Sequence, residues 1–376
     1  MFEIKEIPPV RKALKKFVHF PIDCLYHDSP YYVPALVTDE IDTLDPKKNP
    51  AFDFCESIYF MAYRDGKPVG RIAGIINRVV NERAGKQEGR FGYIDFVDDE
   101  EVVDGLIEAV ACWARGKGMT TLTGPLGFTD MDREGMLVEG FDELSTQATI
   151  YNYDYYQRHM QRLGFSKDVD WIELKITVPP TVPEKMRRVA QIVKTRYGLD
   201  NVKYTNRKKL VRDYGDAIFK LINEAYDQLF GYSPLSQKQI DHYIKMYLPF
   251  LPLEDLSLIV EQDGTLVGVG IAIPSLSRAL IKSRGRLLPL GWLHLLRAFK
   301  GKNQIVDLML VAIKPEYQNK GVNALLFTDL IPYFNKFGYE WAESNPELEL
   351  NDKVLMQWNY FETKQHRRRR AFKKAL

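Results

Sequence analysis

Two segments of this sequence resemble each other, and their shared pattern restricts the folds open to the chain. Residues 58–77 (IYFMAYRDGKPVGRIAGIIN) and 256–275 (LSLIVEQDGTLVGVGIAIPS) each read as a strand, an Asp-Gly turn and a second strand that opens with Val-Gly. The Asp-Gly pairs, at positions 65–66 and 263–264, suit the positive φ angles of a hairpin turn. The sequence therefore predicts two β-hairpins in equivalent positions of a repeat.

The chain also continues in the same way after each hairpin. An apolar strand, an amphipathic helix and another strand follow, at 92–97, 101–116 and 119–123 in the first copy and at 305–312, 321–336 and 340–345 in the second. A hairpin followed by strand–helix–strand, present twice in 376 residues, predicts two similar α/β domains. The prolines of TVPPTVPEK (177–185) continue neither a strand nor a helix, so we expect domains at 1–180 and 181–376.

Composition excludes several classes of protein. The chain is 45% hydrophobic and 27% charged with a net charge of +2, as in globular proteins that stay in solution. Its three cysteines are far apart and odd in number, which is typical of a reducing compartment. The charged start has no signal-peptide core, and no run of about 18 apolar residues could span a membrane. We therefore expect a cytoplasmic protein with no transmembrane segment.

Two basic segments raise the question of an anionic partner. The second copy carries an insert at 278–303, rich in Leu, Arg and Lys, inside a stretch (264–306) that has no acidic residue. Such a basic amphipathic helix could touch a membrane surface, cover a cleft as a lid, or pack with a solvated basic face. The run KQHRRRRAFKK (364–374) could contact phosphates, but we expect a last strand with its arginines exposed. Nucleic acid is an unlikely partner on this pattern, and the scattered histidines predict no metal site.

The turn between the second copy's apolar strand and its helix has the features of an anion site. The segment Gln318-Asn319-Lys320-Gly321 precedes the helix, and a helix N-terminus offers unpaired N–H groups and the positive end of its dipole. Gly321 lacks a side chain that would keep a phosphate away from the backbone. The turn has neither the Gly-Lys-Ser/Thr of a Walker A loop nor a GxGxxG pattern.

At these residues the sequence resembles a known superfamily. The order hairpin, strand, Gln318-x-x-Gly321-x-Asn323-Ala324, helix and strand is similar to that of the GNAT acyl-CoA-dependent N-acyltransferases, whose motif is Gln/Arg-x-x-Gly-x-Gly/Ala. Asn323 departs from that motif. The segment 343–361 resembles the family's fifth strand and the helix after it, with Asn351 at the helix start. As a whole, the chain looks like an uncharacterised bacterial group of tandem GNAT-like proteins.

The resemblance implies a fold, a co-substrate and a site. Each domain would be a mixed, mostly antiparallel twisted sheet flanked by helices, an α/β (α+β) fold. The second would bind acetyl-CoA, or another acyl-CoA, and pass its acyl group directly to an amine of a small molecule or peptide. The pyrophosphate would lie on Gln318, Asn319, Lys320, Gly321, Val322 and Asn323, the pantetheine along Leu310, Val311 and Ala312, and Asn351 would complete the site. The oligomeric state stays open.

Acyl transfer needs a base for the amine and an acid for the thiolate. Asp307 and Glu343 are the candidate bases, and Tyr360 is the candidate acid because the family's usual tyrosine position holds Trp358. In the first copy, the acids at 98–101 would cap the corresponding helix themselves and repel a pyrophosphate, so we expect no CoA there. Two alternatives remain: an aminoacyl-tRNA-dependent transferase of the tandem-GNAT cell-wall type, and a non-catalytic CoA-binding or interaction module.

Overall fold

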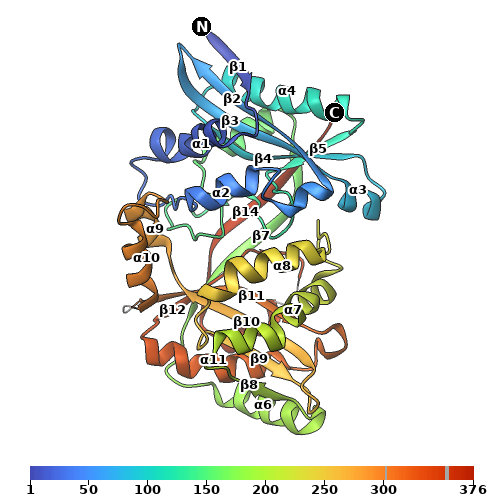
Figure 1. Cartoon of the computed structure of the whole chain (residues 1–376), viewed down its shortest axis with the longest axis vertical. Helices are drawn as coiled ribbons and strands as arrows, with labels where there is room; N and C mark the ends of the chain where they lie inside the picture. The colour runs from blue at the N-terminus through green and yellow to red at the C-terminus, as the bar shows by residue number, and fades with distance from the viewer. Residues whose placement is uncertain (301–302, 352–354) are drawn as a thin grey trace. The chain divides into compact units, whose positions relative to one another are not determined.

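The computed structural model describes residues 1–300, 303–351 and 355–376, and the chain divides into two compact units (Figure 1). The first unit comprises Met1–Ile172, Leu276–Leu295 and His366–Leu376, and the second comprises Glu173–Ser275 and Leu296–Gln365. Two segments from the second half of the sequence thus pack with the first unit. The division therefore differs from a single cut after residue 180.

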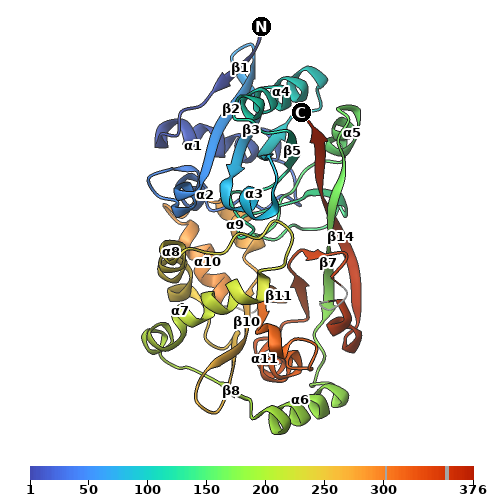
Figure 2. The same cartoon turned by 90° about the vertical axis from the view of Figure 1, so that its right-hand side faces the viewer.

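The first unit is built on a mixed sheet. Its strands are, in spatial order, β1 (Phe2–Glu6), β2 (Cys55–Arg64), β3 (Lys67–Asn77), β4 (Glu88–Phe96), β5 (Thr121–Gly124) and β14 (Thr363–Ala375), with β6 (Met136–Glu139) also paired to β14. Neighbouring strands are antiparallel except for the parallel pair β4–β5. The final strand, dark red in Figure 2, leads to the C-terminus and pairs with β5 through residues 372–375.

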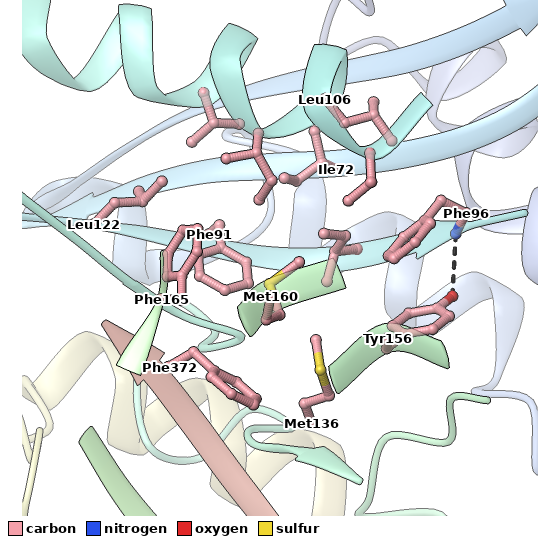
Figure 3. Close-up of a cluster of buried hydrophobic side chains, with 14 of the residues drawn as sticks. Ile72, Phe91, Phe96, Leu106, Leu122, Met136, Tyr156, Met160, Phe165 and Phe372 are labelled. Carbon is pink, nitrogen blue, oxygen red and sulfur yellow. Dashed lines mark hydrogen bonds between the residues drawn. The ribbon is translucent and has the colours of Figure 1, made fainter. Parts of the chain in front are cut away.

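Helices cover this sheet because their apolar residues recur at helical spacing. The helices of the unit are α1 (Arg11–Phe20), α2 (Val37–Leu44), α3 (Arg78–Ala84), α4 (Glu100–Gly116), α5 (Tyr155–Arg162) and α9 (Ser277–Ser283). One core forms where α4 and α5 meet β3 and β14, through residues such as Ile72, Leu106, Met160 and Phe372 (Figure 3). A second core gathers side chains of α1 and α2.

The arginines near the C-terminus lie in β14, and the prediction that they are exposed is wrong. Arg367 and Arg369 are fully buried, and their guanidinium groups donate to the carbonyls of Leu144 and Ile150. Arg370 binds the buried Asp170 at 2.7 Å. These cations tie loops to the strand, since buried charges need such partners.

The second unit repeats the arrangement. Its strands are, in spatial order, the end of β7 (Ser166–Thr177), then β12 (Trp341–Ser344), β11 (Ile305–Ile313), β10 (Leu266–Pro274), β9 (Leu256–Val260) and β8 (Asp200–Val202), and β13 (Glu347–Leu348) also pairs with β7. The pair β11–β12 is parallel and the others are antiparallel. Its helices are α6 (Glu184–Tyr197), α7 (Arg207–Tyr226), α8 (Gln237–Tyr247) and α11 (Asn323–Phe337), while α10 (Gly291–Lys300) spans the division.

The repeat read from the sequence is confirmed in the strand register. Gly70 pairs with Phe96, and Gly268 pairs with Ile313 in the same way. One residue further on, Val97 N–H donates to the Val69 carbonyl at 3.0 Å, as Lys314 N–H donates to the Val267 carbonyl at 2.9 Å. The predicted α/β fold, with mixed sheets flanked by helices, is confirmed.

The two hairpin turns differ in detail. Asp65 and Gly66 both have positive φ angles, of 50° and 76°, as a two-residue hairpin requires. In the second hairpin only Gly264 is left-handed, with φ 88°. The turn there is wider, because Glu261 N–H donates to the Thr265 carbonyl at 2.9 Å.

Candidate functional site

The candidate site begins where two parallel strands of the second unit part. In the part of the chain that the structure describes, β12 pairs with β11 only from Ile305 to Leu308. The register of β11 against β10 then shifts between Ile271 and Ala272, which leaves Met309 as an extra residue. Such a bulge bends a strand and ends its pairing. The edge of β11 from Met309 onward is therefore free of a neighbouring strand on the β12 side.

Side chains rather than a strand bind the carbonyls of this open edge. These carbonyls belong to alternate residues of β11. The side-chain amide of Asn345 donates to the Met309 carbonyl, the Tyr226 hydroxyl donates to the Val311 carbonyl at 2.9 Å, and the Gln318 amide donates to the Ile313 carbonyl at 3.1 Å. In an antiparallel strand the N–H and C=O groups of one residue point to the same side. The backbone of Val311 and Ile313 thus faces the opening, whereas Leu310 and Ala312 face β10.

The turn after β11 forms a concave row of backbone N–H groups. A short 3-10 helix (Pro315–Tyr317) leads into it, Asn319 and Gly321 have φ angles of 60° and 77°, and α11 begins at Asn323. Within the described residues, the N–H groups of positions 319–323 donate to no protein acceptor. Alternating left- and right-handed residues before a helix make an anion-binding nest, and the helix dipole adds to it. This geometry fits a phosphate group.

Gly321 has a different reason to be glycine from the one expected. A Cβ atom there would lie 2.8 Å from Cγ1 of Val189 in α6, so the missing side chain makes room for protein packing. Its φ of 77° also disfavours any other residue. Consequently, a charged side chain at Gly321 would disturb the fold as well as any ligand.

The other polar residues of the turn are engaged by the protein itself. The Lys320 ammonium group lies over the rings of Tyr197 and Tyr317, at 5.4 and 5.6 Å from their centroids. Gln318 holds the turn against the end of β11 through its bond to Ile313. Both residues fix the shape of the nest, and Lys320 places a positive charge beside it.

The structure brings the two predicted bases together. Asp307 and Glu343 are register partners on β11 and β12, and they are 2% and 8% exposed. Glu343 is also the register partner of Lys175 on β7, whose ammonium group lies 4.1 Å from the Trp341 ring centroid. Both carboxylates belong to the paired part of the strands, before the bulge.

Tyr360 and Asn351 lie after β12 and β13. Tyr360 ends a 3-10 helix (Met356–Tyr360), and its ring lies 5.4 Å from the Lys185 ammonium group. No contact of the described residues joins it to Asp307 or Glu343. Asn351 N–H donates to the Leu348 carbonyl at 2.9 Å. The helix expected after Asn351 falls partly on residues 352–354, which lie outside the described residues.

Sequence reasoning missed Glu347. This half-buried carboxylate follows Asn345 by two residues, and both its oxygens accept from the Trp358 indole N–H, at 3.0 and 2.9 Å. Burial raises the pKa of Glu347 to about 7, and the bond from Trp358 opposes that rise. Trp358 is buried and packs on Phe327 of α11, with ring centroids 5.6 Å apart. The one sequence signal was Trp358 itself, at a position where the family usually has tyrosine.

The equivalent edge in the first unit is filled by the chain. Phe96 occupies the position of Ile313, and its N–H donates to the Tyr156 hydroxyl at 3.0 Å (Figure 3). The Tyr155 hydroxyl donates to the Phe96 carbonyl at 2.5 Å. Two tyrosines of α5 thus satisfy the backbone that an open edge would present to a ligand.

The acids at the start of α4 are also paired. Asp99 accepts from Val102 N–H as the helix cap and binds Arg64. Asp98 binds Arg158 at 2.7 Å and His159 at 2.8 Å. Neighbouring cations hold the pKa of both carboxyls below its usual value. This helix mouth therefore carries its own negative charge.

The described residues form neither a metal site nor a membrane-spanning helix. Among them, no group of three or more His, Cys, Asp or Glu side chains could hold a metal ion. None of the helices that they form is long and apolar enough to cross a bilayer.

Comparison with solved structures identifies the fold. The chain superposes over its full length on a tandem GNAT protein from the clavulanic acid biosynthesis pathway, with 98% of that chain covered, a TM-score of 0.59 and 12% identity. A GCN5-related N-acetyltransferase from Sphaerobacter thermophilus gives a TM-score of 0.51 at 14% identity, covering all of this chain and 95% of that one. At such identities the likeness shows the fold alone.

Two curated proteins are similar in sequence, and no family model matches the chain. Protein YghO of Escherichia coli (strain K12) is 26% identical over 327 residues, which is 85% of this chain and 81% of YghO. A bacterial ceramide synthase of Caulobacter vibrioides (strain NA1000 / CB15N) is 28% identical over 308 residues, which is 81% of this chain and 79% of that protein.

Proposed function

Because the chain has the fold of a tandem GNAT protein, we propose that it is an acyl-CoA-dependent N-acyltransferase whose donor site lies in the second unit. The observation that carries the proposal is the open edge of β11, which runs directly into the N–H nest at 319–323. An extended amide chain that ends in a pyrophosphate matches such an edge followed by an anion site. The first unit, whose equivalent edge is filled by Tyr155 and Tyr156, binds no CoA in this proposal.

The residues around the opening fit the parts of acyl-CoA. The N–H groups of 319–323 would hold the pyrophosphate, with Gln318 shaping the nest and Lys320 adding charge. The carbonyls of Val311 and Ile313 already accept from Tyr226 and Gln318, so the N–H groups of these two residues would bind the pantetheine carbonyls. Leu310 and Ala312 would anchor that strand to β10. The bound acyl-CoA would supply the activated thioester.

Transfer requires two proton movements. The amine nitrogen attacks the thioester carbonyl, the carbon–sulfur bond breaks, the nitrogen loses a proton to a base, and the thiolate takes up a proton from an acid. We add Glu347 to the candidate bases Asp307 and Glu343, because it is half-buried rather than buried and its pKa is raised to about 7. A base with a pKa near the working pH is the most effective kind. Tyr360 stays the candidate acid.

Two features of the reaction are proposed next: the length of the acyl group on CoA and the kind of amine that accepts it. The sequence favours acetyl-CoA and an amine on a small molecule or peptide. The relative named a bacterial ceramide synthase points to a second choice, since a ceramide is the amide of a long-chain base and a fatty acid. The donors to test therefore run from acetyl-CoA to octanoyl-CoA, and the acceptors include a long-chain amine.

Asn319→Asp tests the donor site without disturbing the backbone. Asn319 is exposed with φ 60°, and Asp tolerates that left-handed angle as Asn does. A negative charge about 5 Å from one charge of a pyrophosphate costs about 1 kcal/mol in bulk water and about 3 kcal/mol at the effective dielectric constant of a surface site, so affinity should fall about tenfold or more. Calorimetry with acetyl-CoA and octanoyl-CoA measures the change.

Asn206→Asp is the matched control. Asn206 caps α7 by accepting from Lys209 N–H, a role that Asp fills as well. It lies about 30 Å along α7 from Tyr226, at 1.5 Å per residue. Normal CoA binding by Asn319→Asp, or equal losses in both variants, would place the donor elsewhere. Binding without transfer to any amine in the panel would favour the non-catalytic module, and binding of aminoacyl-tRNA but not acyl-CoA would favour the cell-wall type.

A further inference from the structure

A short apolar segment protrudes from the first unit. Between α9 and α10, the side chains of Leu288 and Leu290 are 78% and 61% exposed, and Trp292 at the start of α10 is 47% exposed. Large apolar side chains clustered so closely on a surface are uncommon and mark a contact site. The first copy of the repeat has no counterpart of this segment.

The exposure of these residues does not come from a loose loop, because the segment before them is firmly held. Gly285 accepts from Val37 N–H at 2.9 Å, and Arg284 donates to the Ile22 carbonyl at 3.0 Å. A Cβ atom on Gly285 would lie 2.1 Å from the Ala35 carbonyl oxygen. The fold therefore presents the apolar tip on a fixed support.

The helix that follows continues the exposed surface. Gly291 is the one residue of α10 that is fully buried, although the helix also contains Leu293, Leu295, Leu296 and Phe299. Trp292, Leu296 and Lys300 are all exposed and recur every four residues, so they share one face. Leu293, Leu295 and Phe299 are half-buried, so the exposed apolar surface of α10 is the face that carries Trp292 and Leu296.

The charge of the segment selects the kind of partner. Residues 264–306 contain no acidic residue. Arg284 and Arg286 are bound by Asp23. Lys282, Arg297 and Lys300 are exposed, and among the described contacts none gives them an acidic partner. A second copy docked on this face would bring like charges together with no acid to offset them, whereas an anionic lipid surface offers both negative headgroups and an apolar layer.

We propose that residues 282–300 dock the protein on an anionic lipid bilayer. Leu288, Leu290 and Trp292 enter the boundary between headgroups and acyl chains, and Lys282, Arg297 and Lys300 bind the headgroups. This inference rests on the exposed segment alone and holds whether or not the second unit transfers acyl groups.

Vesicle sedimentation with the full chain tests the proposal. The wild-type protein should bind vesicles of phosphatidylcholine with 30% phosphatidylglycerol, and bind pure phosphatidylcholine at least tenfold more weakly. Leu288→Ser, Leu290→Ser and Trp292→Ser combined should lower the partition coefficient at least tenfold. Lys282→Glu with Arg297→Glu should remove the preference for anionic lipid.

A matched variant distinguishes binding through this segment from nonspecific binding through any exposed apolar side chain. Ile192, Tyr247 and Phe250 are equally exposed apolar residues of the second unit, and replacing all three by Ser should leave vesicle binding unchanged. Circular dichroism checks that each variant is folded. No binding by the wild-type protein, or equal losses in the two triple variants, would overturn the proposal. So would sedimentation equilibrium showing a dimer that depends on the 288–292 residues, without vesicle binding.

Discussion

The titration of Glu347 should make the second unit less stable as the pH rises. Burial raises the pKa of this carboxyl from 4.5 to about 7 in the folded chain, while the unfolded chain keeps the ordinary value. The protonated carboxyl therefore adds to the unfolding free energy in full below pH 4.5, and this added stability is lost as the pH rises through 7. A difference of about 2.5 pH units corresponds to about 3 kcal/mol, and to about 2 kcal/mol after allowance for partial solvent exposure.

Glu347→Gln isolates this effect because its amide oxygen can still accept from the Trp358 indole. The variant should match the wild type at pH 4 and exceed its unfolding free energy by about 2 kcal/mol at pH 8.5. Urea unfolding at both pH values measures the difference, and Glu224→Gln, at an exposed position on α7, is the control. If the unfolding free energies of the Glu347 variant and the wild type change by the same amount between the two pH values, the reasoning fails. If Glu347 also serves as the base, kcat/KM should rise through pH 7 as stability falls.

Three further predictions follow from single contacts. Gly321→Ala should lower the unfolding free energy measured in urea by about 2 kcal/mol or more. Gly338→Ala should lower it by only about 1 kcal/mol, because Gly338 has φ 79° but open space around it, so only the left-handed backbone angle opposes the alanine. Asp255→Asn should leave the unfolding free energy nearly unchanged at about pH 3.5, below the unfolded pKa of 3.8, and raise it at pH 8.5, because burial raises the pKa of Asp255 to about 7. Tyr156→Phe should lower the unfolding free energy by about 1–3 kcal/mol, because the Phe96 N–H loses its partner.

The sequence predicted the order of elements well because the signals for it are local. The pair Asp65-Gly66 can form a two-residue turn without help from the rest of the chain, and it does so. The equivalence of Phe96 and Ile313 follows once both hairpins are aligned. In the candidate site, the order of strands and helices alone places the turn before α11. The same order places Asp307 and Glu343 on neighbouring strands.

What the sequence could not predict depends on contacts between distant residues. The left-handed angle of Gly321 and its packing against Val189 are set by α6, far away along the chain. The raised pKa of Glu347 comes from burial that no local pattern encodes. The sequence placed Arg367 and Arg369 on the surface, because a run of basic residues is usually exposed. In the structure both are buried, and their guanidinium groups donate to carbonyls of a distant loop.

The pairing of β14 with β5 has a consequence for how the protein is made. Residues 372–375 complete a sheet whose other strands lie within the first half of the chain. During synthesis these residues leave the ribosome after β1–β5 and after strands β8–β13 of the second unit, so the sheet of the first unit is completed late. Until then β5 presents an unpaired edge, of the kind that recruits foreign strands. Loss of residues 372–375, by proteolysis or premature termination, would therefore leave β5 in the first unit without its partner strand.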